Sequence, residues 1–164
     1  MANAVVYGFR PIKDENYKAP SAWPVAASQT IAVGDPVSMD TAGRVIIAVA
    51  NSSTIFLGVA ASASASAAVG STIYVWDDPN QQFEAMVSTG ALTDAYTTRS
   101  AAAAFDLAGT TGAFYVNAAA STQNVFKCVG LAKDPVTGED SAVGSNQMKH
   151  WIFNSGVHIF GTIA

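Results

Sequence analysis

The chain has 164 residues and carries only 8 Lys or Arg and 12 Asp or Glu side chains, so that 12% of its residues are charged. An ordinary soluble domain carries about 25%, and a surface so poor in charge is weakly protected against association. The net charge of −4 argues against nucleic acid as a partner, because phosphates are bound by clustered Lys and Arg. The apolar runs at 45–50 and 55–61 fall far short of the ~20 residues that span a bilayer. These features indicate a subunit of a protein assembly, with no nucleic-acid or membrane partner.

The single cysteine, Cys128, excludes an internal disulfide. It lies in the apolar run 125–129, which predicts a buried and unreactive thiol. The first residues of the chain lack the basic and apolar regions of a signal peptide. We therefore expect synthesis in a cytoplasm.

Residues 1–28 predict an extended N-terminal arm. Pro11, Pro20 and Pro24 interrupt any helix, whereas a disordered tail would be poorer in aromatic residues. At about 3.3 Å per residue, an arm of this length reaches about 80–90 Å. The arm either contacts a neighbouring subunit or wraps its own domain, and the sequence leaves both open. The residues that we expect to contact neighbours are Val5, Tyr7, Phe9, Ile12 and Tyr17.

Residues 29–164 predict a single β-rich domain, with a barrel core at about 30–88 and further strands and loops at 89–164. In the core, short β-branched and apolar runs alternate with turns rich in Gly, Asp, Asn and Pro, as in a small barrel or sandwich. The predicted strands are 31–33, 37–39, 44–50, 55–60, 72–76 and 83–87. The Ala/Ser stretch at 60–68 predicts a loop or a strand extension at an interface, or a plain exposed loop.

The second half alternates less clearly. A short helix or turn is predicted at 92–99, with the Ala-rich segment 101–107 as its extension. Strands are predicted at 113–117, 125–131, 148–153 and 158–163, and a hairpin-type loop at 134–140. The predicted fold is mainly β, a small barrel or sandwich with an extended N-terminal arm and little helix.

The sequence contains no recognisable catalytic, cofactor-binding or metal-binding motif. Phosphate-binding glycine loops and paired metal ligands are absent. His150 and His158 lie in predicted strands and are interpreted as packing or surface residues. The acidic loop at 134–140 lacks the alternating carboxylates of a calcium site. We therefore expect no enzyme activity, no catalytic residue, no cofactor and no metal.

Aromatic residues allow one binding hypothesis. Trp23, Trp76 and Trp151, together with tyrosines such as Tyr74, are able to stack on sugar rings if they are exposed. The favoured interpretation is that Tyr74 and Trp76 share one face of a strand and fill the core.

Three short motifs follow one another along the chain in a characteristic order. Gly34-Asp35-Pro36-Val37 leads into one strand, Leu57-Gly58-Val59-Ala60 lies in a second, and Gly70-Ser71-Thr72-Ile73-Tyr74-Val75 opens a third. The order resembles the small β-barrel of tailed-bacteriophage capsid decoration (cement) proteins and related virion structural proteins. The glycines fit this interpretation, because Gly34 and Gly70 allow sharp turns and Gly58 relieves crowding or forms a bulge.

The resemblance covers about residues 30–88 and implies a role without chemistry. It implies a protein that binds the outside of the phage head, has the major capsid protein as its partner and stabilises the capsid lattice. It also implies a homo-oligomer, most often a trimer. Strand edges at 45–50 or 55–60 would need covering by a neighbouring protein. The alternative is a carbohydrate- or receptor-binding β module of a virion fibre or surface protein.

Overall fold

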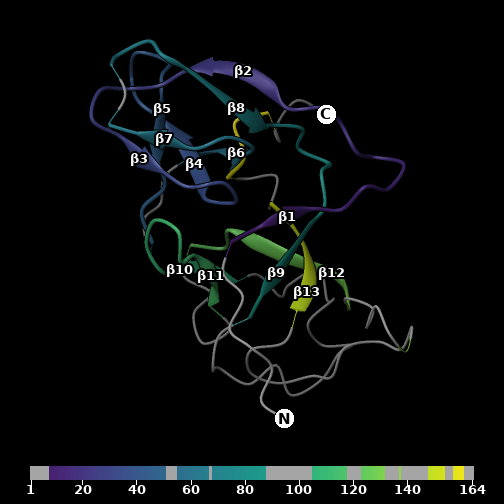
Figure 1. Ribbon diagram of the computed structural model, residues 1–164. Coiled ribbons are helices and arrows are strands. Elements are labelled where there is room, and N and C mark those ends of the chain that lie inside the picture. The colour runs from purple at the N-terminus through teal and green to yellow at the C-terminus, as the bar shows by residue number, and fades with distance from the viewer. Residues whose placement is uncertain are drawn as a thin grey trace.

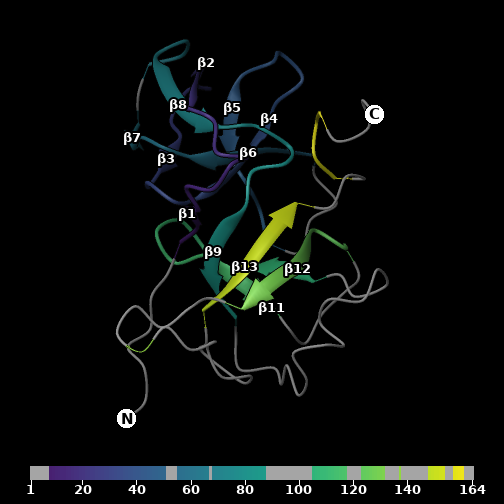
Figure 2. The ribbon, with the colours of Figure 1, turned by 90° about the vertical axis from the view of Figure 1, so that its right-hand side faces the viewer.

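The computed structural model describes residues 8–50, 55–66, 68–87, 105–117, 123–131, 137, 148–153 and 157–160. Over these ranges the regular structure is β-strand throughout, arranged in antiparallel sheets, which confirms the mainly-β prediction. Figures 1 and 2 show two sheets packed against each other, as in a sandwich, and neither sheet closes into a barrel. No helix in the described part of the chain has the length and apolar character needed to cross a membrane.

The first sheet is five-stranded and contains the segment in which the sequence motifs lie. Its spatial order is β2 (Ser21–Pro24), β8 (Thr72–Trp76), β6 (Phe56–Ala60), β4 (Pro36–Met39) and β5 (Val45–Ile47). A two-stranded ribbon of β3 (Thr30–Ile31) and β7 (Ser64–Ala65) accompanies it. Part of the Ala/Ser stretch is therefore a strand paired within its own chain.

The second sheet is four-stranded and lies below the first in Figures 1 and 2. Its order is β1 (Arg10–Pro11), β9 (Phe83–Met86), β13 (Met148–Phe153) and β12 (Phe126–Leu131). A hairpin of β10 (Asp106–Ala108) and β11 (Tyr115–Asn117) adjoins this sheet. Single bridges, Val87–Val116 and Phe105–Phe126, join the hairpin to it.

Strand β6 lies between two hydrophobic cores. Phe56 and Val59 belong to a large aromatic core under the four-stranded sheet, whereas Leu57 and Ala60 belong to an aliphatic core with strands of their own sheet. All five residues of the strand are buried. A strand that faces apolar neighbours on both sides needs a continuous apolar run, which is what 55–60 provides.

Gly58 is required by the close packing at the middle of β6. A Cβ atom at this position would overlap the carbonyl oxygen of Trp76 in the neighbouring strand. On the other side, the register with β4 shifts between Val37 and Ser38, which marks a bulge. Both roles predicted for this glycine, relief of crowding and a bulge, are therefore confirmed.

Residues 8–25 of the predicted arm lie along their own chain. Strand β1 pairs with β9 at one edge of the four-stranded sheet, and β2 pairs with β8 at one edge of the five-stranded sheet. Between them, the Ile12 backbone N–H donates to the carbonyl of Gln82 at 2.9 Å. The segment thus follows the chain from β8 to β9 in the antiparallel direction. The division at residue 28 into arm and domain stays a prediction.

Three expectations from the sequence are wrong in detail. Tyr74 was expected in the core, but it is 49% exposed, because Ile73 and Val75 occupy the buried face of β8. The segment 105–107 is extended rather than helical, since Phe105 pairs with Phe126 and β10 begins at Asp106. The run 55–60 forms a central strand and has no free edge. The helix predicted at 92–99 and the loop at 134–140, apart from residue 137, lie outside the described residues.

The edge of β5 is covered by the chain itself, where a neighbouring protein was expected to cover it. Ala26 donates its backbone N–H to the carbonyl of Val45 at 2.9 Å, and the Gln29 side-chain oxygen accepts the backbone N–H of Ile47 at 2.9 Å. A parallel bridge also joins Val25 to Val45. Polar backbone groups of β5 that would attract another strand are thus occupied.

Candidate functional site

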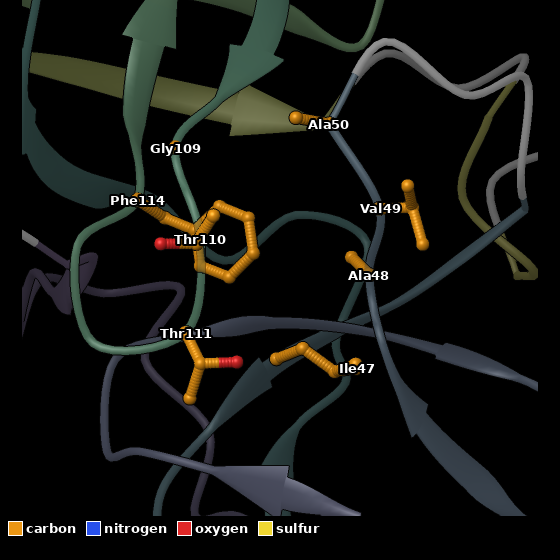
Figure 3. A pocket seen from close by; sticks show the side chains of 8 residues that line it. All are labelled: Ile47, Ala48, Val49, Ala50, Gly109, Thr110, Thr111 and Phe114. Atoms are coloured by element: carbon orange, nitrogen blue, oxygen red, sulfur yellow. The ribbon is translucent and has the colours of Figure 1, made fainter.

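An open apolar pocket of about 390 Å³ lies where the chain leaves β5 and meets the turn between β10 and β11. Figure 3 shows the side chains from the β5 side facing those of the turn across it. None of the lining residues is charged, and Val49 beside the pocket is 60% exposed. The lining residues of this apolar pocket are Ile47, Ala48, Val49, Ala50, Gly109, Thr110, Thr111 and Phe114.

The turn that forms one wall of the apolar pocket is held by a buried carboxylate. Asp35 accepts the backbone N–H of Gly112 with both oxygens, at 2.9 and 3.1 Å, and that of Ala32 at 2.8 Å. The Thr111 hydroxyl donates to the carbonyl of Thr30 at 3.3 Å. Gly109 has a φ of +100°, and a side chain there would overlap the backbone of Ala113. The wall is therefore fixed from both sides of the turn.

Asp35 has no solvent exposure, and this burial raises the pKa of its carboxyl group above the ordinary value of 3.8. The hydrogen bonds from Ala32 and Gly112 act in the opposite direction, because they favour the charged form. The Gly-Asp-Pro motif was recognised in the sequence as a turn. Its link to Gly112 was not predicted, because no local pattern signals a partner so far along the chain.

The predicted contact residues of the arm have different environments. Phe9 is 1% exposed and stacks on Phe126 with ring centroids 4.9 Å apart, so it anchors the arm in the aromatic core. Ile12 and Tyr17 are partly exposed, and the Lys13 ammonium lies 5.9 Å from the Tyr17 ring centroid. Val5 and Tyr7 lie outside the described residues. The contribution of these residues to contacts with neighbours stays a prediction.

A second, smaller pocket lies beside the arm. It has a volume of about 250 Å³ and is formed where residues 8–11 pass the turn at 33–34. Trp76 lies on its wall, and Val33 at its rim is 57% exposed. Residues of the arm thus line a surface pocket and also contribute to the hydrophobic core.

The two histidines have different surroundings. His150 is partly exposed, with Nε2 at 3.7 Å from a Glu84 carboxylate oxygen, and burial lowers its pKa below 6.5. His158 is buried, which also lowers its pKa. In the described part of the chain, no group of three or more His, Cys, Asp or Glu residues is placed to hold a metal ion. Cys128 is buried as predicted.

The aromatic residues offer little support for a sugar-binding face. Trp151 is fully buried and donates its indole N–H to the Ala85 carbonyl at 3.0 Å. Trp23 is partly buried and donates to Asp77 at 2.9 Å. Tyr74 is exposed, on the outer face of β8. The described aromatic side chains therefore serve mainly to pack the molecule.

The described residues thus form a mainly-β fold with an apolar pocket whose lining residues are uncharged. Residues 17–75 match the phage cement protein family, which confirms the resemblance seen in the sequence motifs. The match runs from just before β2 to within β8, so it coincides with the five-stranded sheet. This segment of the chain is thus similar to phage cement proteins. No curated protein matches the chain.

Proposed function

We propose that this protein is a capsid decoration protein that binds the outer surface of the phage head and stabilises the lattice of the major capsid protein. The observation that carries the proposal is the match of residues 17–75 to the phage cement protein family. In this role the chain acts without catalysis. It assembles as a homo-oligomer, with a trimer as the expected form, and is made in the host cytoplasm before it joins the head.

The apolar pocket is the part of the described surface best suited to contact the capsid. Its walls carry no charge, so covering them costs no desolvation of an ion. Each buried Å² of apolar area contributes about 25 cal/mol before the cost of association. The pocket is preformed, because Asp35 fixes its turn. Binding there loses little conformational entropy on the protein side.

The arm supplies a second contact region. Phe9 fixes it in the core, and Ile12 and Tyr17 are partly exposed and so accessible to a neighbour. Val5 and Tyr7 are further contact residues in this proposal. Because Phe9 anchors the arm, Ile12 and Tyr17 are held in one arrangement. This supports a role in contacts between subunits.

The pocket is tested by adding purified protein to phage heads that lack it and measuring the bound copies per head. Val49→Asp places a charge beside the pocket, and we expect at least a tenfold weaker affinity, since about 1.4 kcal/mol corresponds to tenfold. Val69→Asp is the matched control, because Val69 is 54% exposed and does not line the pocket. Failure of the unaltered protein to bind any head contradicts the proposed function. Equal binding by both variants removes the pocket from it.

The arm is tested by side-chain substitution rather than by deletion. Deleting residues 2–20 would remove Phe9 from the aromatic core and confound binding with folding. We expect the double variant Ile12→Ala, Tyr17→Ala to fold normally and to bind heads more weakly. Native mass spectrometry of the same samples measures the oligomeric state. Unchanged occupancy at the unaltered affinity excludes these two side chains from the contact.

A further inference from the structure

Residues 157–160, which we call the C-terminal clasp, are fastened to the first residue of β6. The backbone N–H of Phe56 donates to the carbonyl of Val157 at 2.7 Å, and the N–H of Ile159 donates to the carbonyl of Phe56 at 2.8 Å. His158 forms the parallel bridge with Phe56 that these bonds define. The clasp is thus a turn joined to β6 by one bridged residue, at a strand that contributes to both hydrophobic cores.

The buried side chain of His158 stabilises the turn of the clasp through a hydrogen bond. The residue is 3% exposed, and its Nδ1 accepts the backbone N–H of Phe160 at 3.1 Å. Because Nδ1 is an acceptor, the neutral ring carries its proton on Nε2. Nε2 is buried near the Leu57 backbone without a hydrogen bond of good geometry. The ring therefore fits this place only in its neutral form.

Aromatic rings surround His158 and extend the clasp to other strands. Its ring centroid lies 5.6 Å from that of Phe153 in β13 and 5.9 Å from that of Phe160. Phe160 in turn lies 6.3 Å from Trp23 in β2. The clasp consequently ties β13 of one sheet to β6 and β2 of the other.

The charged groups around His158 come from one segment. Asp77 and Asp78, which follow β8, favour the protonated ring, whereas the packed residues of β6 and β13 are apolar. Desolvation outweighs the two carboxylates and lowers the pKa of His158 below 6.5. Asp77 is also engaged with Trp23 and with the Ser21 hydroxyl, at 2.9 and 3.0 Å.

From this geometry we infer that the clasp is an acid-sensitive latch: protonation of His158 releases residues 157–160 from β6. A proton on Nδ1 sets an N–H against the N–H of Phe160, so that an acceptor is replaced by a second donor. The same step places a charge among aromatic rings. Release uncovers Phe56 and the side of Trp23 that Phe160 covers. The inference is independent of capsid binding and concerns a change within the chain.

The experiment is hydrogen exchange at the Ile159 amide, whose acceptor is Phe56. We expect its protection, corrected for the intrinsic rate, to fall at least about tenfold between about pH 7.5 and about pH 5, on either side of the ordinary histidine pKa. His158→Asn keeps an acceptor near Nδ1 but does not titrate, so its protection should be the same at both values. His150→Asn is the matched control, because His150 is the other histidine of the chain and should leave the loss unchanged. Equal protection of the unaltered protein at both values overturns the inference.

A second measurement does not depend on the folding of a variant. In the unaltered protein, nuclear magnetic resonance follows the imidazole of His158 and the amides of Ile159 and Phe160 during one pH titration. We expect a common midpoint below 6.5 for all three signals. A ring that titrates while both amides stay constant overturns the inference, and so does a ring that titrates at 6.5 or above.

Discussion

The carboxylate of Asp35 accepts the backbone N–H of Gly112 across 77 positions of sequence. It joins the turn before β4 to the turn between β10 and β11, and thereby the five-stranded sheet to the hairpin beside the other sheet.

Asp35→Ala leaves the N–H groups of Ala32 and Gly112 without this acceptor. We expect a loss of about 1–3 kcal/mol in the free energy of unfolding, the usual cost of unpaired buried polar groups. Urea denaturation measures it, with Asp40→Ala as the comparison, since the Asp40 carboxylate also accepts two backbone N–H groups, those of Ala42 and Arg44, but remains partly exposed to solvent. A loss at Asp35 no larger than at Asp40 would contradict the role given to this carboxylate.

The raised pKa of Asp35 gives a pH dependence of definite sign. The folded state binds the Asp35 proton more tightly than the unfolded state, whose pKa is near 3.8. The contribution of Asp35 to stability therefore rises as pH falls through the raised pKa toward 3.8, and is lowest at neutral pH. Asp35→Asn does not titrate. We expect the stability difference, unaltered protein minus variant, to increase on acidification across this window. A difference that decreases instead is incompatible with burial as the dominant cause.

A substitution at Gly58 tests whether the close packing between β6 and β8 is required for stability. In Gly58→Ala the added Cβ overlaps the backbone of Trp76, which cannot move without disturbing the sheet. We expect a loss of about 3 kcal/mol or a failure to fold. Gly70→Ala is the control, because Gly70 has a φ of +83° but open space around its Cβ position, so its cost is backbone strain alone, about 1–2 kcal/mol. Thermal unfolding compares them, and equal losses would show that the close approach is unimportant.

Phe9 tests whether the arm belongs to the core. Phe9→Ala removes a buried ring that stacks on Phe126, and substitutions of this kind cost about 3–5 kcal/mol. Ile12→Ala, in the same segment but partly exposed, should cost about 1 kcal/mol or less. Chemical denaturation measures both. If the two substitutions cost the same, the arm is not anchored by this ring.

Local sequence patterns predicted most of the described fold. Strands β4, β5, β6 and β8 of the five-stranded sheet were predicted within a few residues, because short β-branched runs and the turn residues between them specify strands directly. Strand β2 was not predicted, because its residues lie in the proline-containing segment interpreted as an extended arm. The role of Gly58 also followed from its place inside such a run. What the sequence did not specify was which face of β8 is buried. Its outward positions carry Thr72 and Tyr74, and the aromatic residues Tyr74 and Trp76 outweighed Ile73 and Val75 in the prediction. Trp76 at the end of the strand is partly buried and packs against the aromatic core.

Tertiary partners account for the remaining differences. The segment 105–107 has a composition that suits a helix, but pairing with Phe126 fixes Phe105 in an extended conformation. The edge of β5 is covered by Gln29, whose side chain is able to take that place only because residues 25–29 run beside the strand. The apolar pocket likewise arises where two distant segments meet. Such contacts leave no periodic signal in either segment.

Strand β6 serves as a common spine, since neighbouring residues along it point into different cores. Neither half of the molecule is able to melt while the other keeps its native packing, so calorimetry should record one transition. In the role proposed above, this coupling would have a mechanical consequence. A load applied to one layer is shared at once by both, and the protein yields as a whole or not at all.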